Sequence, residues 1–354
     1  MAQLPVEIQL TSEIVQILSE VDEFKGRFSN AAGIPREKLN LLRKVATIES
    51  IGSSTRIEGV KLTDQEIAEL LERLDLNSFK NRDEEEVAGY AEAINLVYES
   101  YQELRLTENY VRQLHARLLQ YVAKDQRHRG DYKKFSNHVE AFDADGKSIG
   151  VVFETATPFD TPRAMKDLVD WARDHFEDRS MHPLVVIAIF TVHFLAIHPF
   201  QDGNGRLSRI LTTLLLLKSG YEYVPYSSLE TVIEANKDRY YIALRRTQGT
   251  LKGDEPVYDP WLRFFFGALQ KQKRNLEAKF ETTLKTSSLP ELSEKIHELS
   301  KQKERLTMHD IELAIDAPKS SIKFHLKKLV AGGSLDRHGQ GRGVWYSQGS
   351  QKSL

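Results

Sequence analysis

Apolar residues recur every three or four positions along most of the chain, which is the spacing of one face of an α-helix. Segments with this pattern are residues 38–48, 63–74, 84–101 and 107–121. Thr63 followed by Glu66 predicts a capping box at one helix start, and Thr107 is expected to cap another. Pro162 stands where a further helix over 163–176 would begin. The pattern therefore predicts a mainly α-helical fold.

One stretch departs from the helical spacing. Residues 135–157 are rich in β-branched and aromatic side chains and contain Asp145-Gly146, a turn signal that predicts a β-hairpin. An isolated hairpin is only marginally stable in water, so we expect this one to pack against helices.

Two strongly apolar helices are expected on either side of a short polar segment. Residues 184–197 (LVVIAIFTVHFLAI) are apolar nearly all round, as in a helix at the middle of a bundle. Residues 209–218 continue as RILTTLLLLK, and Gly220 suits the position after a helix. The segment 198–206 between them is an unusual place for His, Asp, Asn and Arg.

Charge and composition favour a soluble globular protein without disulfides. The 354 residues favour about two domains, and 40% hydrophobic with 28% charged residues is typical of a soluble globular chain. Lys and Arg number 49 against 51 Asp and Glu, so the net charge gives no reason to expect nucleic acid or membrane binding. The absence of cysteine excludes disulfides, thiolate metal sites and a cysteine nucleophile. The first ten residues lack the pattern of a secretory signal, and residues 184–197 are too short to span a bilayer, so we expect a cytoplasmic protein.

The last part of the chain differs in composition. Residues 282–291 (TTLKTSSLPE) are expected to be a linker, and residues 295–354 hold eleven basic against six acidic residues. This region reads as a helix over 307–315, a turn, a second helix over 319–331 and a short basic hairpin over 334–347. The order predicts a helix-turn-helix followed by a wing.

The segment 198–209 (HPFQDGNGRLSR) concentrates the candidate chemistry. Residues 203–205 (Gly-Asn-Gly) allow positive φ and a close approach of the backbone to a ligand. They directly precede a helix, whose N-terminal N–H groups favour anions. Arg206 and Arg209 share one face of the first turn, which indicates a ligand with more than one phosphate. The segment is not a P-loop, because no Gly-Lys-Ser/Thr follows.

Two more residues of this segment suit metal and acid–base chemistry. Asp202 offers one carboxylate beside the anion site, and Mg²⁺ typically takes one or two carboxylates together with phosphates and waters. His198 precedes the same turn, and imidazole is the usual general base near neutral pH. Each feature alone has a plain structural explanation, as a turn, a helix cap or surface charge. Their combination within twelve residues favours a nucleotide-phosphate site with a base beside it.

The segment resembles the signature HPFx(D/E)GNGRxxR of the Fic (filamentation induced by cyclic AMP) family at every fixed position, and the resemblance extends over about residues 35–270. It implies a Fic-type helical bundle with a β-hairpin flap, followed by a small winged-helix domain. The domains expected are an N-terminal helical segment over 1–105, a Fic core over 106–280 and a winged helix over 290–354.

The resemblance implies a protein adenylyltransferase, which moves AMP from ATP to a Ser, Thr or Tyr hydroxyl of a target protein. His198 would take the proton from that hydroxyl, and Asp202 would hold Mg²⁺ between the phosphates. Arg206 would hold the β-phosphate and Arg209 the γ-phosphate. The residues implied at the ATP site are Asp202, Gly203, Asn204, Gly205, Arg206, Leu207, Ser208, Arg209, Tyr240, Tyr241 and Gln248. For the two tyrosines, ordinary helix packing is an equally good explanation.

The expected hairpin would be the family's target-docking flap. Its outer strand, about residues 149–155, could pair with an extended target segment by β-augmentation. The docking residues implied are Val152, Phe153, Glu154 and Thr155. A hairpin that only packs against the helices is the alternative.

A second motif, over residues 54–59, resembles the family's inhibitory pattern (S/T)xxxE(G/N), with Ser54, Glu58 and Gly59 at its fixed positions. The resemblance implies that Glu58 pairs with Arg209 and leaves ATP in an unproductive pose. In some relatives the same Glu also directs water to remove AMP from the target. Without the main signature the motif would read as an ordinary helix end, with Gly59 after its last turn.

A rival interpretation makes the chain a DNA-binding regulator that senses nucleotide through the Fic domain. Lys319, Lys323 and Lys327 recur every four residues on the second helix of the helix-turn-helix, and Arg337 and Arg342 lie on the wing. Such residues would contact DNA phosphates without sequence preference, although many winged helices bind protein or only pack. The expected partners are a target protein and ATP, with DNA and a second copy in a homodimer left open.

Overall fold

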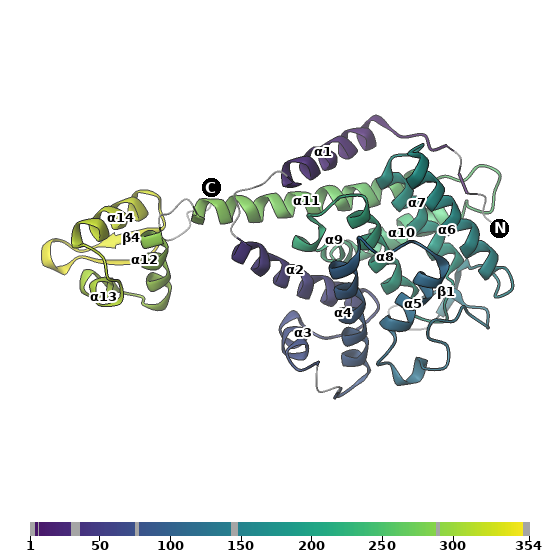
Figure 1. Ribbon diagram of the computed structural model, residues 1–354, viewed down its shortest axis with the longest axis horizontal. Coiled ribbons are helices and arrows are strands. Elements are labelled where there is room, and N and C mark those ends of the chain that lie inside the picture. The colour runs from purple at the N-terminus through teal and green to yellow at the C-terminus, as the bar shows by residue number, and fades with distance from the viewer. Residues whose placement is uncertain are drawn as a thin grey trace. The chain divides into compact units, whose positions relative to one another are not determined.

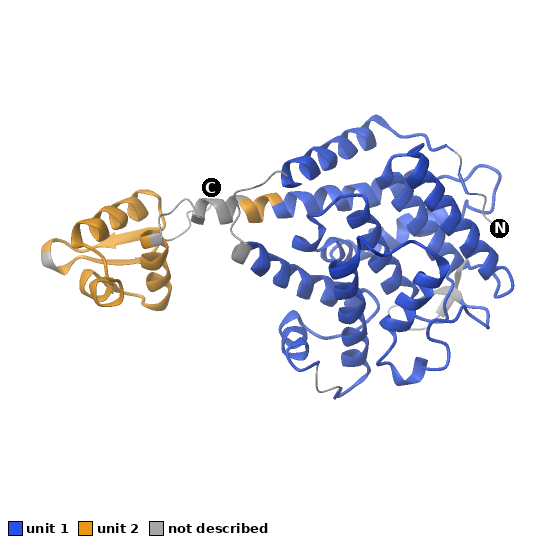
Figure 2. Ribbon diagram, in the orientation of Figure 1, with its two compact units in different colours: residues 1–276 blue, residues 277–354 orange. Residues whose placement is uncertain are grey.

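The computed structural model describes residues 4–5, 7–29, 36–74, 78–142, 148–287 and 291–349. Helices predominate in the described part of the chain, which also holds two small antiparallel sheets (Figure 1). The chain forms two compact units, residues 1–276 and residues 277–354 (Figure 2). The prediction of a mainly α-helical fold is confirmed.

The first unit consists of helices around one apolar helix. Its helices are α1 (Ser12–Ser29), α2 (Arg36–Ile57), α3 (Asp64–Leu71), α4 (Arg82–Ser100), α5 (Glu108–Leu118), α6 (Thr161–Asp178), α7 (Pro183–Ile197), α8 (Asn204–Lys218), α9 (Leu229–Glu234), α10 (Lys237–Gln248) and α11 (Asp259–Ser287), the last continuing into the second unit. Thr63 and Glu66 form the predicted capping box at the start of α3, and the Thr107 side chain caps α5. No helix among the described residues has the length and apolar character that crossing a membrane requires.

The apolar helix is α7, and it lies at the centre of the first unit. Every residue from Leu184 to Ile197 is buried, and the helix packs against α6, α8 and α10. A helix that is apolar all round loses contact with water only when other elements surround it, so the predicted central position is confirmed. Because α8 follows α7 after a short turn and packs beside it, the polar segment lies where α7 ends and α8 begins.

The predicted hairpin is present beside these helices. Strand β1 (His138–Phe142) pairs antiparallel with β2 (Ser148–Glu154), with His138 opposite Glu154. Strand β2 contacts α10. The predicted turn residues Asp145 and Gly146 lie outside the described residues.

The N-terminal helices share a core with the later ones. Helix α2 packs against α9, and α4 packs against α5 and α8. The sequence analysis did not predict α1, although Ile14, Leu18, Val21 and Phe24 are buried at helical spacing on it. The same helix lies along α11 (Figure 1), where Glu20 accepts a hydrogen bond from Gln270 at 2.9 Å. The three-part division of the chain stays a prediction.

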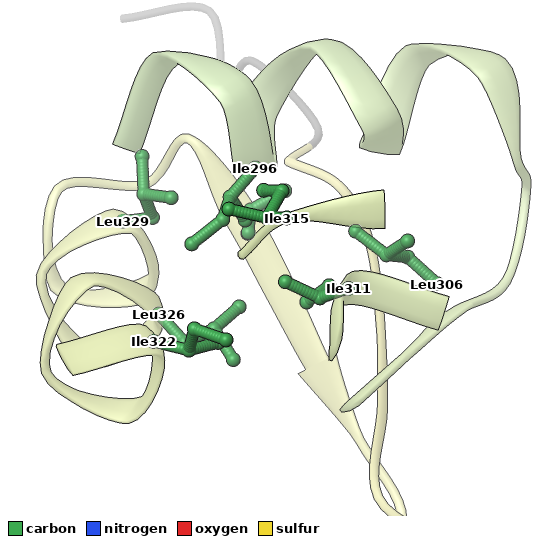
Figure 3. Packing of buried hydrophobic residues seen from close by; sticks show 8 residues of the cluster. Ile296, Leu306, Ile311, Ile315, Ile322, Leu326 and Leu329 are labelled. Carbon is green, nitrogen blue, oxygen red and sulfur yellow. The ribbon is translucent and has the colours of Figure 1, made fainter. Parts of the chain in front are cut away.

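The second unit has its own small core. Its elements are α12 (Glu291–Gln302), β3 (Leu306–Thr307), α13 (Met308–Ala314), α14 (Lys319–Ala331), β4 (Leu335–His338) and β5 (Trp345–Gln348). The strands form one sheet in the order β3-β5-β4. Buried leucine and isoleucine side chains from the helices and from β3 and β4 converge between them (Figure 3): Ile296, Leu306, Ile311, Ile315, Ile322, Leu326, Leu329 and Leu335. The two predicted helices and the terminal hairpin are therefore present.

The predicted linker over residues 282–291 is wrong for most of its length. Helix α11 continues to Ser287, and α12 begins at Glu291. The Ser and Thr residues that suggested a linker are only mildly unfavourable inside a helix. No Gly or Pro interrupts the segment before Pro290, so the backbone of α11 can stay helical.

Close packing of α4 on α5 depends on Gly89, where an added Cβ would lie 2.0 Å from the Leu118 carbonyl oxygen. We expect Gly89→Ala to lower the free energy of unfolding by roughly 1–3 kcal/mol, because two helix backbones must move apart. Denaturant unfolding followed by circular dichroism measures this. Gly267→Ala in α11 is the matched control, because no atom lies within 4 Å of its added Cβ; it should be neutral or stabilising. Equal effects of the two substitutions would contradict the packing argument.

Candidate active site

The turn between α7 and α8 has a strained backbone. His198 follows the last residue of α7 with φ 51° and ψ 61°, a left-handed conformation that costs an L-residue roughly 1–2 kcal/mol. Asn204 fixes the turn, because its Oδ1 accepts from the Phe200 N–H at 2.9 Å and its Nδ2 donates to the Phe200 carbonyl at 2.8 Å. The side chain of Asn204 therefore holds the turn, and only its backbone N–H is left for a ligand.

The two glycines of the turn serve different purposes. Gly203 has φ 78° and precedes α8, whose first turn has no side-chain cap. Gly205 lies inside α8 and does not have positive φ, so that part of the expectation is wrong for it. A Cβ at Gly205 would come within 2.2 Å of Oε1 of Glu58. The glycine therefore lets the Glu58 carboxylate lie against the uncapped N-terminus of α8, where negative charge is favoured.

Arg209 of α8 is buried and bonds to the end of α2. Its Nε donates to Ser54 Oγ at 2.7 Å, and its Nη2 donates to the Ser54 carbonyl at 2.9 Å and to Glu58 Oε1 at 2.7 Å. Gly59 follows α2 with φ 106°. Burial opposes the charge on Arg209, but the Glu58 carboxylate raises the pKa of Arg209 above its usual value. The guanidinium therefore stays charged, and one carboxylate compensates it.

Arg206 has a different partner, which the sequence analysis missed. Its Nη1 donates to Oε2 of Glu86 in α4 at 2.7 Å, and its Nη2 lies 3.4 Å from Oδ1 of Asp202. The side chains of Arg206 and Glu86 are 3% and 10% exposed, so this pair lies in the interior. The available signal was an acidic residue four positions before the buried Tyr90, on the apolar side of the helix.

Asp202 is ionised and partly exposed. It accepts hydrogen bonds from the Gly203 N–H at 2.6 Å and from Arg82 Nη2 at 3.0 Å. Burial raises the pKa of Asp202, but Arg206, the Gly203 amide and Arg82 together lower it below its usual value. Such a carboxylate fits one position in the coordination shell of Mg²⁺. Since the described residues contain no cluster of three or more metal-ligating side chains, phosphates and waters would supply the other ligands.

His198 is uncharged near neutral pH. Burial, and then the charge of Lys133, lower the pKa of His198 to about 4. Its Nδ1 has no hydrogen-bond partner in the part of the chain that the structure describes. A neutral imidazole can accept a proton, as a general base must.

Lys133 is a second residue that the sequence analysis missed. It is 3% exposed, and its Nζ donates to Asn137 Oδ1 at 2.8 Å, to Thr155 Oγ1 at 2.8 Å and to the Ile197 carbonyl at 3.0 Å. Its backbone N–H donates to the Pro199 carbonyl at 2.8 Å. Burial lowers the pKa of Lys133 to about 8. The side chain thus connects both ends of the hairpin to the turn that carries the histidine, and a Lys-Lys pair in a loop gave no sign of this.

The residues implied on the adenosine side lie in α10. Tyr240 is 3% exposed, and its ring lies 5.1 Å from the ring of Tyr241 and 5.9 Å from that of Trp261. Gln248 is buried at the end of the helix. Since α10 packs against α7 and β2, helix packing accounts for the position of Tyr240, whereas Tyr241 is partly exposed.

The remaining residues implied at the ATP site and in the flap differ in how exposed their side chains are. Leu207 and Ser208 are buried in α8, and Ser208 Oγ donates to the Gly205 carbonyl at 2.7 Å. Their side chains therefore stabilise the helix and its packing. In the flap, Glu154 is exposed and lies 3.4 Å from Lys252. The side chains of the other two flap residues, Val152 and Phe153, lie outside the described residues.

Replacing Lys133 with Met removes the buried charge but keeps the length of the side chain. We expect the pKa of His198 to rise, because a cation that opposes its protonation is gone. Histidine ring signals followed by NMR between about pH 4 and pH 8 measure this. Lys133→Arg retains the charge and should keep the pKa near that of the parent. An unchanged pKa in a folded Lys133→Met variant would contradict the electrostatic role.

Comparison with known proteins supports a family assignment. Residues 105–216 match the family model described as Fic/DOC family. The protein adenylyltransferase Fic of Drosophila willistoni is 27% identical over 271 residues, which are 74% of this chain and 49% of that protein. The protein of the same name from Drosophila ananassae is 26% identical over 270 residues, with 74% and 49% covered. The chain thus spans about half the length of the curated relatives it matches.

Solved structures share the fold. A Fic family protein from Desulfovibrio desulfuricans G20 aligns over 98% of both chains with a TM-score of 0.63 and 23% identity. Fic-1 from C. elegans aligns over 77% of this chain and 74% of that chain, with a TM-score of 0.58 and 18% identity. The matched family region contains the whole segment 198–209 and its turn geometry. Residues 105–216 are thus similar in sequence to the Fic/DOC family, and the chain shares its fold with solved Fic structures.

Proposed function

We propose that this chain is a protein adenylyltransferase, which transfers AMP from ATP to a hydroxyl of a target protein. The observation that carries the proposal is the uncapped N-terminus of α8, with the neutral His198 before it and the buried Arg209 in its second turn. Such a helix start binds phosphate, and a neutral imidazole beside it can activate a hydroxyl. The relatives from Drosophila willistoni and Drosophila ananassae are named protein adenylyltransferases, which supports the same reaction.

In the proposed reaction the target hydroxyl attacks the α-phosphate of ATP. His198 accepts the hydroxyl proton, a new oxygen–phosphorus bond forms, and the bond to pyrophosphate breaks. The backbone N–H groups at the start of α8 stabilise the negative charge that develops on the phosphate oxygens. Asp202 would hold Mg²⁺, which when bound supplies a positive charge that offsets those of the phosphates.

The two arginines take unequal parts in this proposal. Arg206 Nη1 is held by the buried Glu86, so a phosphate could meet this side chain only through Nη2, which lies 3.4 Å from Asp202. Its pairing therefore supports a role in holding α4 and Asp202 in place. Arg209 needs only to exchange Glu58, whose side chain is 30% exposed, for a phosphate of ATP.

We further propose that Glu58 inhibits transfer. Its carboxylate lies against Gly205 and bonds Arg209, so it occupies the place that the anion site would offer a phosphate. An inhibitor of this kind is part of the chain itself and competes at a high effective concentration. ATP could then bind only in a pose that does not use Arg209.

The hairpin is proposed to position the target. Strand β2 has β1 as its one strand partner among the described residues, so its other edge can pair with an extended segment of a target protein. Lys133 and Thr155 fix the base of this hairpin to the turn that carries His198. A target segment on β2 would thus have a defined position relative to the general base.

We propose that the second unit is a winged-helix module, but its charged residues give little support for DNA binding. Its order of helix, turn, helix and β-hairpin is that of a winged helix. All three lysines of the predicted basic face, Lys319, Lys323 and Lys327, are exposed, but Lys319 pairs with Glu312 at 2.7 Å and its charge is partly compensated. The side chain of Arg342 lies outside the described residues. We therefore do not extend the proposal to DNA.

Glu58→Gly should raise AMP transfer about ten- to a hundredfold, because Arg209 and the start of α8 become free for ATP. Incorporation of α-labelled ATP into protein, by parent and variant at equal concentration, measures the change. Glu58→Gln keeps the bulk near Gly205 without the charge and should give a smaller gain. Adding Arg209→Ala to Glu58→Gly should abolish the gain. Equal or lower activity of a folded Glu58→Gly variant would refute inhibition by Glu58.

His198→Ala, made in the Glu58→Gly background, should lower AMP transfer roughly 10²- to 10⁴-fold, the usual contribution of a general base. ATP affinity, measured by calorimetry, should change little because the start of α8 is intact. His309→Ala, at an exposed position of the second unit, is the control and should retain activity. Transfer at the parental rate by the His198 variant would show that another group takes the proton.

A further inference from the structure

A second cavity, of about 1170 Å³, lies at the other end of the two central helices. Pro183 at the start of α7 and Lys218 at the end of α8 line it, whereas the candidate active site lies where α7 ends and α8 begins. Each helix has 15 residues, so about 20 Å separates the two places. The cavity is therefore a separate site, which we name the distal groove.

The distal groove carries an excess of positive charge. Its lining includes one carboxylate residue, Glu177, and five Lys or Arg residues, namely Lys25, Arg105, Arg173, Arg179 and Lys218. In the whole chain basic and acidic residues nearly balance, at 49 and 51. This local excess comes from four elements far apart in sequence, so the fold, and not a run of like residues, brings the cations together.

In the described part of the chain, four of these cations form no ion pair within 4 Å, although the charge of Lys25 acts on the Asp22 carboxylate at longer range. Lys25 Nζ donates to the Ser219 carbonyl at 2.8 Å, and Lys218 Nζ lies 3.3 Å from the Tyr101 carbonyl. Within the described residues, neither these lysines nor Arg105 and Arg179 have a carboxylate oxygen within 4 Å; the fifth cation, Arg173, pairs with Asp170.

The cations also act on one another. Burial, and then the charge of Arg105, lower the pKa of Lys218. Like charges held this close repel, and a bound anion would relieve the repulsion.

Arg179 has an unusual backbone for its residue type. It follows α6 in the left-handed region, with φ 55° and ψ 27°, a position that usually holds glycine. Among the described residues, the other non-glycine residue with positive φ is His198. Such strained residues cluster at functional sites, because elsewhere a glycine would remove the cost. The strained backbone of Arg179 is therefore a second observation, beside the cluster of cations, that marks this groove.

Part of the lining of the distal groove is apolar. Its apolar lining comes from Leu106, Phe176, Met181, Pro183 and Leu215. Small-molecule sites combine such an apolar lining with a few charged groups that fix the ligand. A guanidinium group binds phosphate through paired hydrogen bonds, which makes it better suited to phosphate than to a single negative atom.

From this combination we propose that the distal groove binds an organic oligophosphate, with the phosphates at the cations and the organic part on the apolar lining. The proposal does not depend on the adenylyltransferase reaction. The same phosphate chemistry occurs in a nucleotide and in inorganic polyphosphate, so the experiment must separate these two sources.

The test uses the full chain with inorganic tripolyphosphate and with ATP, each titrated by calorimetry at low salt. Hydrogen exchange with mass spectrometry locates the binding. We expect protection in residues 102–108 and 176–184, while peptides over 198–209 report binding at the active site separately. Tighter binding of ATP than of tripolyphosphate at the groove peptides supports an organic oligophosphate, and equal binding would contradict a contribution of the apolar lining.

Two variants test the assignment to the cations. Arg105→Glu with Arg179→Glu should weaken binding of tripolyphosphate at the groove about tenfold or more. Arg179→Gly should also weaken it, while raising the melting temperature because the strained backbone is relieved. The control, Arg163→Glu with Lys166→Glu, changes the same net charge on exposed positions of α6 and should leave binding unchanged.

Three results would overturn the proposal. One is the absence of protection at the groove peptides with both probes. Another is binding that Arg179→Gly and the double charge reversal leave unchanged. The third is equal protection by polyglutamate, which would indicate a docking surface for an acidic protein segment and not a phosphate site.

Discussion

The pair of Arg209 and Glu58 is the interaction on which the site depends. A buried guanidinium is costly without a compensating anion, and in the described structure Glu58 is that anion. The pair fixes the end of α2 against the start of α8, and Gly205 is needed because the carboxylate lies so close to the helix backbone. The N-terminus of α8 and Arg209 therefore require an anion together, and a phosphate could replace Glu58 without leaving either one unsatisfied.

The rigid part of the site comes from α7. Because this helix is buried on all sides, its end is a fixed point, and the left-handed conformation of His198 is maintained by contacts on both sides of the turn. Asn204 holds the turn from α8, and Lys133 holds it from the hairpin. The flap and the histidine thus share one hydrogen-bonded base, so a displacement of the hairpin would disturb the environment of the imidazole.

Much of the site could be predicted from the sequence, because its residues are local. The segment 198–209 carries its own turn and helix start, and the pairing of Glu58 with Arg209 followed from the resemblance. The partner of Arg206 and the charge that acts on His198 could not be predicted. Glu86 and Lys133 reach the site through helix packing and hairpin docking, and neither has a distinctive neighbour in sequence. The segment predicted as a linker is helical up to Ser287, since Ser and Thr are only mildly unfavourable inside a helix.

The contrast between Arg206 and Arg209 shows what tertiary structure adds to a motif. The two arginines are three residues apart and share a helix face, so the sequence alone assigns both to phosphate. The structure gives Arg206 a partner that is 10% exposed and Arg209 a partner that is 30% exposed. When a carboxylate that is shielded from water leaves its partner, both charges remain buried and uncompensated. A carboxylate near solvent can be rehydrated as it leaves. In the proposed reaction, the position beside Arg209 is therefore the one at which a phosphate would replace a carboxylate, and the exposure of Glu58 supports the proposal that this residue inhibits transfer.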